Sequence, residues 1–79
     1  MEATKIKLKP KLTNEEMQLF VKRVKYYQEN FNHRLGEACW HALAQVNYPV
    51  CEQITRTPID PYWDDSRVSA FCFWLLSDE

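Results

Sequence analysis

The sequence predicts an all-α fold: three or four short helices in a compact bundle, with an extended basic N-terminal arm. Three observations favour this class. Apolar residues recur at three- and four-residue steps after Thr13, prolines divide the second half of the chain into short segments, and only one segment alternates as a β-strand does. The 79 residues suffice for one domain. We therefore expect an arm over residues 1–12 and a single helical domain over residues 13–79.

The arm is predicted from the segment KIKLKPKL, in which lysines occupy alternate positions: Lys5, Lys7, Lys9 and Lys11. In an extended segment Ile6 and Leu8 would share the opposite face. Pro10 has no N–H donor and therefore excludes a central strand. We interpret the segment as an arm. The alternative is an α+β fold, in which residues 5–12 pair with a second strand in a small sheet.

The clearest helix begins after Thr13. The Thr13 hydroxyl can accept from the N–H of Glu16, and the Glu16 carboxylate can accept from the N–H of Thr13, which is a capping box. The apolar residues that follow at helical spacing are Met17, Phe20, Val21, Val24, Tyr27 and Phe31. They predict an apolar stripe along a helix of about five turns.

Two further helices are expected in the middle of the chain. Asn32 is the predicted N-cap of the first, with a single bent helix over residues 14–46 as the alternative. Gly36 would lie inside either version, at a cost of about 1 kcal/mol relative to alanine. Pro49 suits the first turn of a short helix over residues 50–55.

The last helix is expected to start at Asp64 or Asp65 and to run to about Ser77. Between Val68 and Leu76, Ser69 is almost the only polar residue, so that apolar side chains surround this part of the helix axis. A helix of this kind is buried on all sides, and a short chain has few other elements that could cover it. The helix is therefore either central in the fold or covered in part by a second molecule, and we favour the second molecule.

The segment DPYWDD before this helix combines three carboxylates with two aromatic rings. A proline-stiffened turn that caps the helix accounts for these residues. The alternative is a contact surface for a partner, with Trp63 as a candidate contact residue. A calcium-binding loop is excluded because the segment has no glycine. In addition, the twelfth position counted from Asp60 is Phe71, where such a loop needs glutamate.

Neither a metal site nor an enzyme active site is indicated. The cysteines Cys39, Cys51 and Cys72 are odd in number and form no Cys-x-x-Cys pair, which predicts reduced core thiols. Zinc accepts Cys and His ligands, but Cys39 and His41 would point about 200 degrees apart on a helix. The sequence contains no glycine-rich phosphate loop or hydrolase motif. We expect no enzyme activity and no cofactor.

Charge is unevenly distributed, although the net charge is −1. Residues 1–25 carry seven lysines and arginines against three glutamates. Residues 26–79 carry three arginines against eight aspartates and glutamates. This polarity fits a basic arm that meets an acidic partner, a head-to-tail contact between copies, or neutralisation within the monomer. No apolar run long enough for a membrane span and no secretory signal occurs in the sequence, so we expect a cytoplasmic protein.

These features predict a small non-enzymatic protein-interaction module: an adaptor, inhibitor or regulatory subunit that acts sterically on a larger protein partner and forms a homodimer. The candidate partner-binding residues are Lys5, Lys7, Lys9, Lys11, Trp63, Phe73 and Trp74. The alternative is a nucleic-acid-binding accessory protein that uses the lysines of the arm on phosphates.

Overall fold

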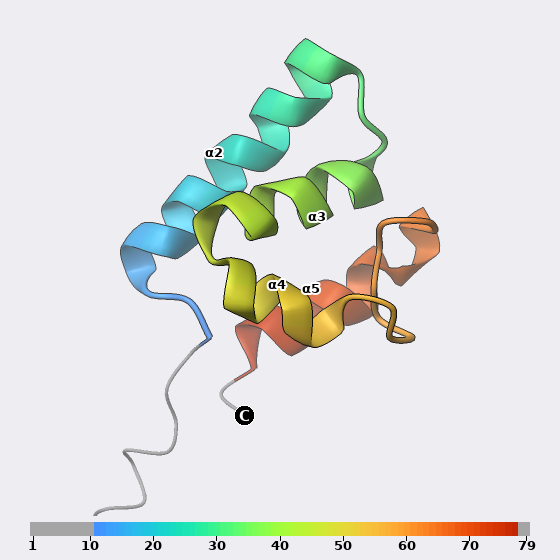
Figure 1. The fold of residues 1–79 in the computed structure, drawn as a ribbon. Coiled ribbons are helices and arrows are strands. Elements are labelled where there is room, and N and C mark those ends of the chain that lie inside the picture. The colour runs from blue at the N-terminus through green and yellow to red at the C-terminus, as the bar shows by residue number, and fades with distance from the viewer. Residues whose placement is uncertain (1–10, 78–79) are drawn as a thin grey trace, which may run out of the picture.

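The structure, a computed structural model, describes residues 11–77. Its α-helices are α2 (Asn14–Phe31), α3 (Leu35–Val46), α4 (Tyr48–Ile54) and α5 (Val68–Leu76), and a short 3-10 helix, η1 (Asp65–Arg67), precedes α5 (Figure 1). The predicted all-α class is confirmed, and residues 11–77 contain no β-strand. Most of the predicted arm, and with it most of the alternative strand, falls on residues 1–10 and lies outside the described residues.

Helix α3 is the central element of the fold. It lies between α2 on one side and α4 and α5 on the other (Figure 1), and it contacts α2, α4, η1 and α5. Helix α5, which is apolar around its axis, therefore packs at the outside of the bundle and not at its centre. One side of α5 faces the core and the other is left without a covering element of residues 11–77.

The core draws on α2, α3, α4 and α5 and on Leu12, which precedes the N-cap of α2. Its buried members are Leu12, Phe20, Cys39, Ala42, Leu43, Val50, Cys51, Ile54, Phe71 and Leu75. Phe71 and Leu75 lie four residues apart and so share one face of α5. The rings of Phe20 and Phe71 lie with their centroids 6.2 Å apart and join α2 to α5. Leu12, which the sequence assigns to the arm, belongs to this core.

Helix α2 starts as predicted but buries only part of its apolar stripe. The N–H of Glu16 donates to Thr13 Oγ1 and the N–H of Thr13 donates to Glu16 Oε1, each at 3.0 Å, which confirms the capping box. Phe20 is buried, whereas Val21 and Phe31 are exposed. Part of the stripe therefore faces away from the core.

The connection between α2 and α3 differs from the prediction. Asn32 adopts the left-handed conformation, with φ 56°, and ends α2 as its C-cap. Asparagine tolerates this conformation and can therefore end a helix. The N-cap position of α3 is occupied by Arg34 instead of Asn32. The chain is non-helical over residues 32–34, so the single bent helix is also wrong. At the start of α3, the Glu37 carboxylate accepts from the N–H of Arg34 at 2.9 Å.

The start of α3 is fastened to the start of the last helical segment. Asp65 Oδ1 accepts from the N–H of Gly36 at 2.9 Å and from Arg34 Nη1 at 2.8 Å. Asp64 Oδ1 accepts from the N–H of Ser66 at 2.9 Å, so that η1 begins where the sequence predicts a helix start. The first turn is a 3-10 turn, and the α-helical part begins only at Val68.

Helix α4 is short, as the sequence predicts. Pro49 lies in its first turn, and Asn47 Oδ1 accepts from the N–H of Val50 at 3.3 Å. The helix begins at Tyr48 and ends at Ile54. It leads into the loop of residues 55–64, which shapes the second of the two surfaces described below.

Candidate interaction surfaces

The outer side of α5 and the neighbouring part of α2 present three exposed apolar side chains, Val21, Phe73 and Leu76, which we call the α5 surface. Phe73 is 79% exposed, Leu76 67% and Val21 59%. Isolated apolar residues are normal on protein surfaces, but a cluster of large ones indicates a site of contact. The α5 surface is the first candidate.

Two hollows flank the α5 surface. The first has a volume of about 330 Å³ and is lined by Met17, Phe20, Val21, Cys72, Leu75 and Leu76. The second, a broad hollow of about 920 Å³, is lined by Ile59, Ser69, Ala70, Phe73, Trp74 and Ser77. Leu76 borders the first hollow and Phe73 borders the second, whose lining includes Ser69 and Ser77, so projecting apolar side chains and hollows lie next to each other on one surface.

Trp74 is only half-buried, but it packs against the protein itself. The ammonium of Lys11 lies 4.7 Å from the centroid of the Trp74 ring, which is a cation–π contact. Lys11 Nζ also donates to the carbonyl of Ser77 at 3.0 Å, where a cation suits the end of a helix. Among the candidate partner-binding residues of α5, Phe73 is therefore the projecting one.

A second surface is formed by four aromatic rings, those of Trp40, His41, Tyr62 and Trp63, which line a cavity of about 270 Å³ together with Thr55, Arg56 and Asp60. We call it the aromatic pocket. The Tyr62 ring lies edge-on to the Trp40 ring, with centroids 5.6 Å apart and an interplanar angle of 87°. The centroids of the Trp63 and Tyr62 rings lie 4.7 Å apart, and the Trp63 side chain is 77% exposed. The pocket is thus lined by aromatic rings in several orientations, and one of these rings, that of Trp63, is exposed to solvent.

The buried carboxylate of Asp60 shapes the loop that carries this pocket. Asp60 is 3% exposed. Its Oδ2 accepts from the N–H of Arg56 at 2.7 Å and its Oδ1 accepts from the N–H of Tyr62 at 3.0 Å. Arg56 has a φ of 66°, in the left-handed region that non-glycine residues seldom adopt. The two hydrogen bonds hold Arg56 and Tyr62 at the edge of the pocket.

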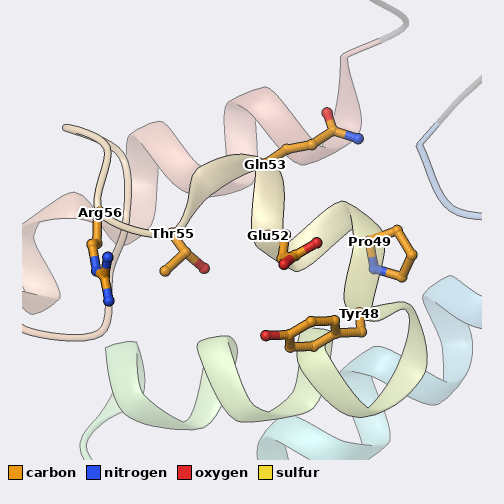
Figure 2. Close-up of a pocket in the computed structure, with 6 residues that line it drawn as sticks. All are labelled: Tyr48, Pro49, Glu52, Gln53, Thr55 and Arg56. Carbon is orange, nitrogen blue, oxygen red and sulfur yellow. The ribbon is translucent and has the colours of Figure 1, made fainter.

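A second hollow, of about 510 Å³, adjoins the aromatic pocket and is lined by Tyr48, Pro49, Glu52, Gln53, Thr55 and Arg56. Figure 2 shows the Tyr48 ring and the Arg56 side chain bordering the same space, with Glu52 and Thr55 between them. Thr55 and Arg56 line both hollows, so the two adjoin each other.

A pair of histidines connects the aromatic pocket to α2. The centroids of the His33 and His41 rings lie 4.9 Å apart, and the Tyr27 ring stacks on His33 at 5.6 Å. His33 Nδ1 is buried and has no hydrogen-bond partner among residues 11–77. Burial lowers the pKa of His41, and the nearby His33 lowers it further, whereas Glu37 acts in the opposite direction. These effects favour the neutral form of the His41 ring.

Acid should destabilise the fold through His41. Since the pKa of His41 is lower in the folded protein, the unfolded chain binds more protons, and the free energy of unfolding should fall as the pH drops below about 6.5. Urea denaturation between pH of about 7.5 and about 5 measures this effect. His41→Asn should reduce the slope. A wild-type free energy of unfolding that rises over the same range would contradict the proposed titration.

The cysteines do not form a site. Burial raises the pKa of the Cys39 thiol to about 12 and that of Cys51 to about 11, and it also raises the pKa of Cys72. Residues 11–77 hold no group of three or more His, Cys, Asp or Glu side chains that could bind a metal ion. The predicted core position of Cys39 and Cys51 is confirmed.

The structure separates the residues that the sequence singles out. Phe73 lies on the α5 surface and Trp63 on the aromatic pocket, and the hollows at these two places share no residue. Lys11 lies against Trp74. The other candidate lysines, Lys5, Lys7 and Lys9, lie outside the described residues.

Several surface residues escaped prediction because distant segments bring them together. Trp40 and Tyr62 are 22 positions apart in the sequence, and Val21 joins the α5 surface from another helix. No local pattern marks such pairs.

In the described part of the chain, no helix has the length and apolar character needed to cross a membrane. Comparison with protein-family models, with curated proteins and with solved structures gave no match.

Proposed function

We propose that the protein is a small non-enzymatic interaction module, an adaptor, inhibitor or regulatory subunit, that docks a larger protein partner and forms a homodimer through the α5 surface. The observation that carries this proposal is the Phe73 side chain, which is 79% exposed and borders a hollow whose lining is apolar except for Ser69 and Ser77. Its action on the partner would be steric.

Burial of the α5 surface would favour association. Fully burying a leucine or phenylalanine side chain contributes about 1.5 to 3 kcal/mol. The hollow beside Leu76 has no polar side chain in its lining, so a side chain that enters it leaves no polar group without a partner. Phe73 and Leu76 therefore resemble the apolar anchors that dominate the energetics of protein interfaces.

A two-fold symmetric dimer suits this surface. In such a dimer the same patch is used on both subunits, and each contact occurs twice. Because projecting side chains and hollows lie on one patch, Phe73 of each copy can cover a hollow of the other. The α5 surface supplies the apolar centre that stable interfaces need.

Phe73→Glu should abolish the dimer, because the substitution would bury a carboxylate at the centre of the contact. We expect light scattering over a concentration series to give a dimer for the wild type and a folded monomer for the variant, with unchanged helicity by circular dichroism. Trp63→Ala is the matched control, since Trp63 is equally exposed on the other surface and should leave the dimer intact.

The same variants test the larger partner. A co-purifying protein that is lost with Phe73→Glu and retained with Trp63→Ala would support docking at the α5 surface. Wild-type protein that stays monomeric throughout the series would overturn the homodimer. A partner that both variants retain would overturn the assignment of docking to this surface.

A further inference from the structure

We propose that Ile6 and Leu8 of the chain's own N-terminal arm dock in the larger hollow of the α5 surface, where the arm competes with a second copy of the protein. This hollow of about 920 Å³, which we call the Phe73 hollow, is lined by Ile59, Ser69, Ala70, Phe73, Trp74 and Ser77. The docking of the arm stands by itself, whereas the competition rests on the proposed homodimer.

The arm joins the described part of the chain at the rim of the Phe73 hollow. The ammonium of Lys11, the first described residue, lies 4.7 Å from the centroid of the Trp74 ring. It also donates to the carbonyl of Ser77 at 3.0 Å. Trp74 and Ser77 both line the hollow. The segment before Lys11 therefore starts within one side-chain length of this site.

The reach of the arm matches the length of the hollow. Its α5 lining recurs at four-residue steps, from Ser69 through Phe73 to Ser77, and so follows one face of the helix over about 12 Å. An extended chain advances by at most about 3.6 Å per residue. Leu8 can therefore lie up to about 10 Å from the first described residue, and Ile6 up to about 17 Å. Together they can cover the hollow from its Ser77 end towards Ser69.

The residues of the arm suit this site. In an extended segment Ile6 and Leu8 share one face and the lysines share the other. Pro10 disfavours the helical conformation for Lys9, which precedes it, and favours an extended one. Among residues 11–77, no charged side chain contributes to the lining of the Phe73 hollow. The apolar face of the arm can therefore be buried while its lysines stay in water and no charge is buried.

The attachment of the arm favours it over a free ligand of similar chemistry. A segment held by a short linker reaches its site at an effective concentration on the order of millimolar. The outer side of α5 has no covering element from residues 11–77, so the arm would displace only water there. A separate apolar peptide would have to reach the same concentration in solution to compete.

The competition follows because both occupants use Phe73. In the proposed dimer, Phe73 of each copy covers a hollow of the other, whereas the docked arm lies against the same ring. A second copy can bind only those molecules whose arm has left the hollow, and its apparent affinity falls with the fraction of such molecules. Removing the apolar side chains of the arm should therefore strengthen the dimer.

The docking is tested with a soluble nitroxide, which relaxes the NMR signals of exposed protons. The sample is the full chain at a concentration at which light scattering gives the monomer. The Phe73 and Trp63 rings are exposed to a similar extent, at 79% and 77%, so Trp63 serves as the internal reference. We expect weaker relaxation of Phe73 than of Trp63 in the wild type. The double variant Ile6→Ser, Leu8→Ser should relax both rings equally.

The matched control is the double variant Lys7→Ser, Lys9→Ser, which changes the other face of the same segment and should keep Phe73 protected. Light scattering over a concentration series then tests the competition. The dissociation constant of the dimer should be at least about tenfold lower for Ile6→Ser, Leu8→Ser than for the wild type. The lysine variant should change it far less.

Equal relaxation of the Phe73 and Trp63 rings in the wild-type monomer would overturn the docking. Protection of Phe73 that survives Ile6→Ser, Leu8→Ser would show that these two side chains are not its cause. A protected Phe73 with an unchanged dissociation constant would overturn the competition alone. Protein that stays monomeric with and without the substitutions would overturn the homodimer, while the relaxation of Phe73 still decides the docking.

Discussion

Replacing Gly36 with alanine should lower the free energy of unfolding by about 3 kcal/mol. Gly36 is buried in the first turn of α3, where an added Cβ would overlap the backbone carbonyl oxygen of Pro61 and crowd the Asp65 carboxylate. Alanine is the better helix former by about 1 kcal/mol, but a backbone carbonyl cannot move aside as a flexible side chain can. The steric cost should therefore exceed the gain in propensity.

Urea denaturation followed by circular dichroism measures the effect of Gly36→Ala. Leu35→Ala is the matched control, because Leu35 occupies the neighbouring position and is exposed. It should change the free energy of unfolding far less. If Gly36→Ala increased stability, helix propensity would govern this position and the close approach of Pro61 to α3 would be wrong.

Replacing Asp60 with alanine should also cost about 3 kcal/mol, because it removes the charged acceptor of two N–H groups. The N–H groups of Arg56 and Tyr62 would lose a carboxylate that is itself almost fully buried. The loop would then no longer hold Arg56 in its left-handed conformation. The aromatic pocket should open as the protein loses stability.

Chemical denaturation and the aromatic NMR resonances of Tyr62 report the two parts of the Asp60→Ala effect. Asp64→Ala is the control within the same segment. Asp64 also accepts a backbone N–H, that of Ser66, but it is exposed, so its loss should cost much less than the loss of Asp60. Equal losses for the two aspartates would show that burial of the Asp60 carboxylate contributes nothing.

The parts of the fold that follow from neighbouring residues could be predicted from the sequence. The capping box joins Thr13 to Glu16, and the first turn of α4 is set by Pro49, so both are readable within a few positions. The role of Asn32 was wrong for a different reason. Asparagine is accepted both at a helix start and in a left-handed helix end, and only the path of the following chain decides between them.

The candidate surfaces required the tertiary structure. The contact between Gly36 and Asp65 joins positions 29 residues apart, and it places the loop of the aromatic pocket against α3. The sequence identified Phe73 and Trp63 as candidates from their residue types, but it could not assign them to separate surfaces. It also could not foresee that Lys11 would pack on Trp74, since the two lie at opposite ends of the chain.

The reactivity of the two core thiols, Cys39 and Cys51, can be used to measure how often the folded protein opens. Only the thiolate reacts with common thiol reagents, and the raised pKa values of Cys39 and Cys51 keep both thiols protonated while α3 and α4 remain packed. Their modification rate at neutral pH should therefore equal the reaction rate of a free thiol multiplied by the fraction of molecules that have opened. Cys72, at the edge of a hollow on α5, should react sooner and lose reactivity when a second molecule covers that hollow.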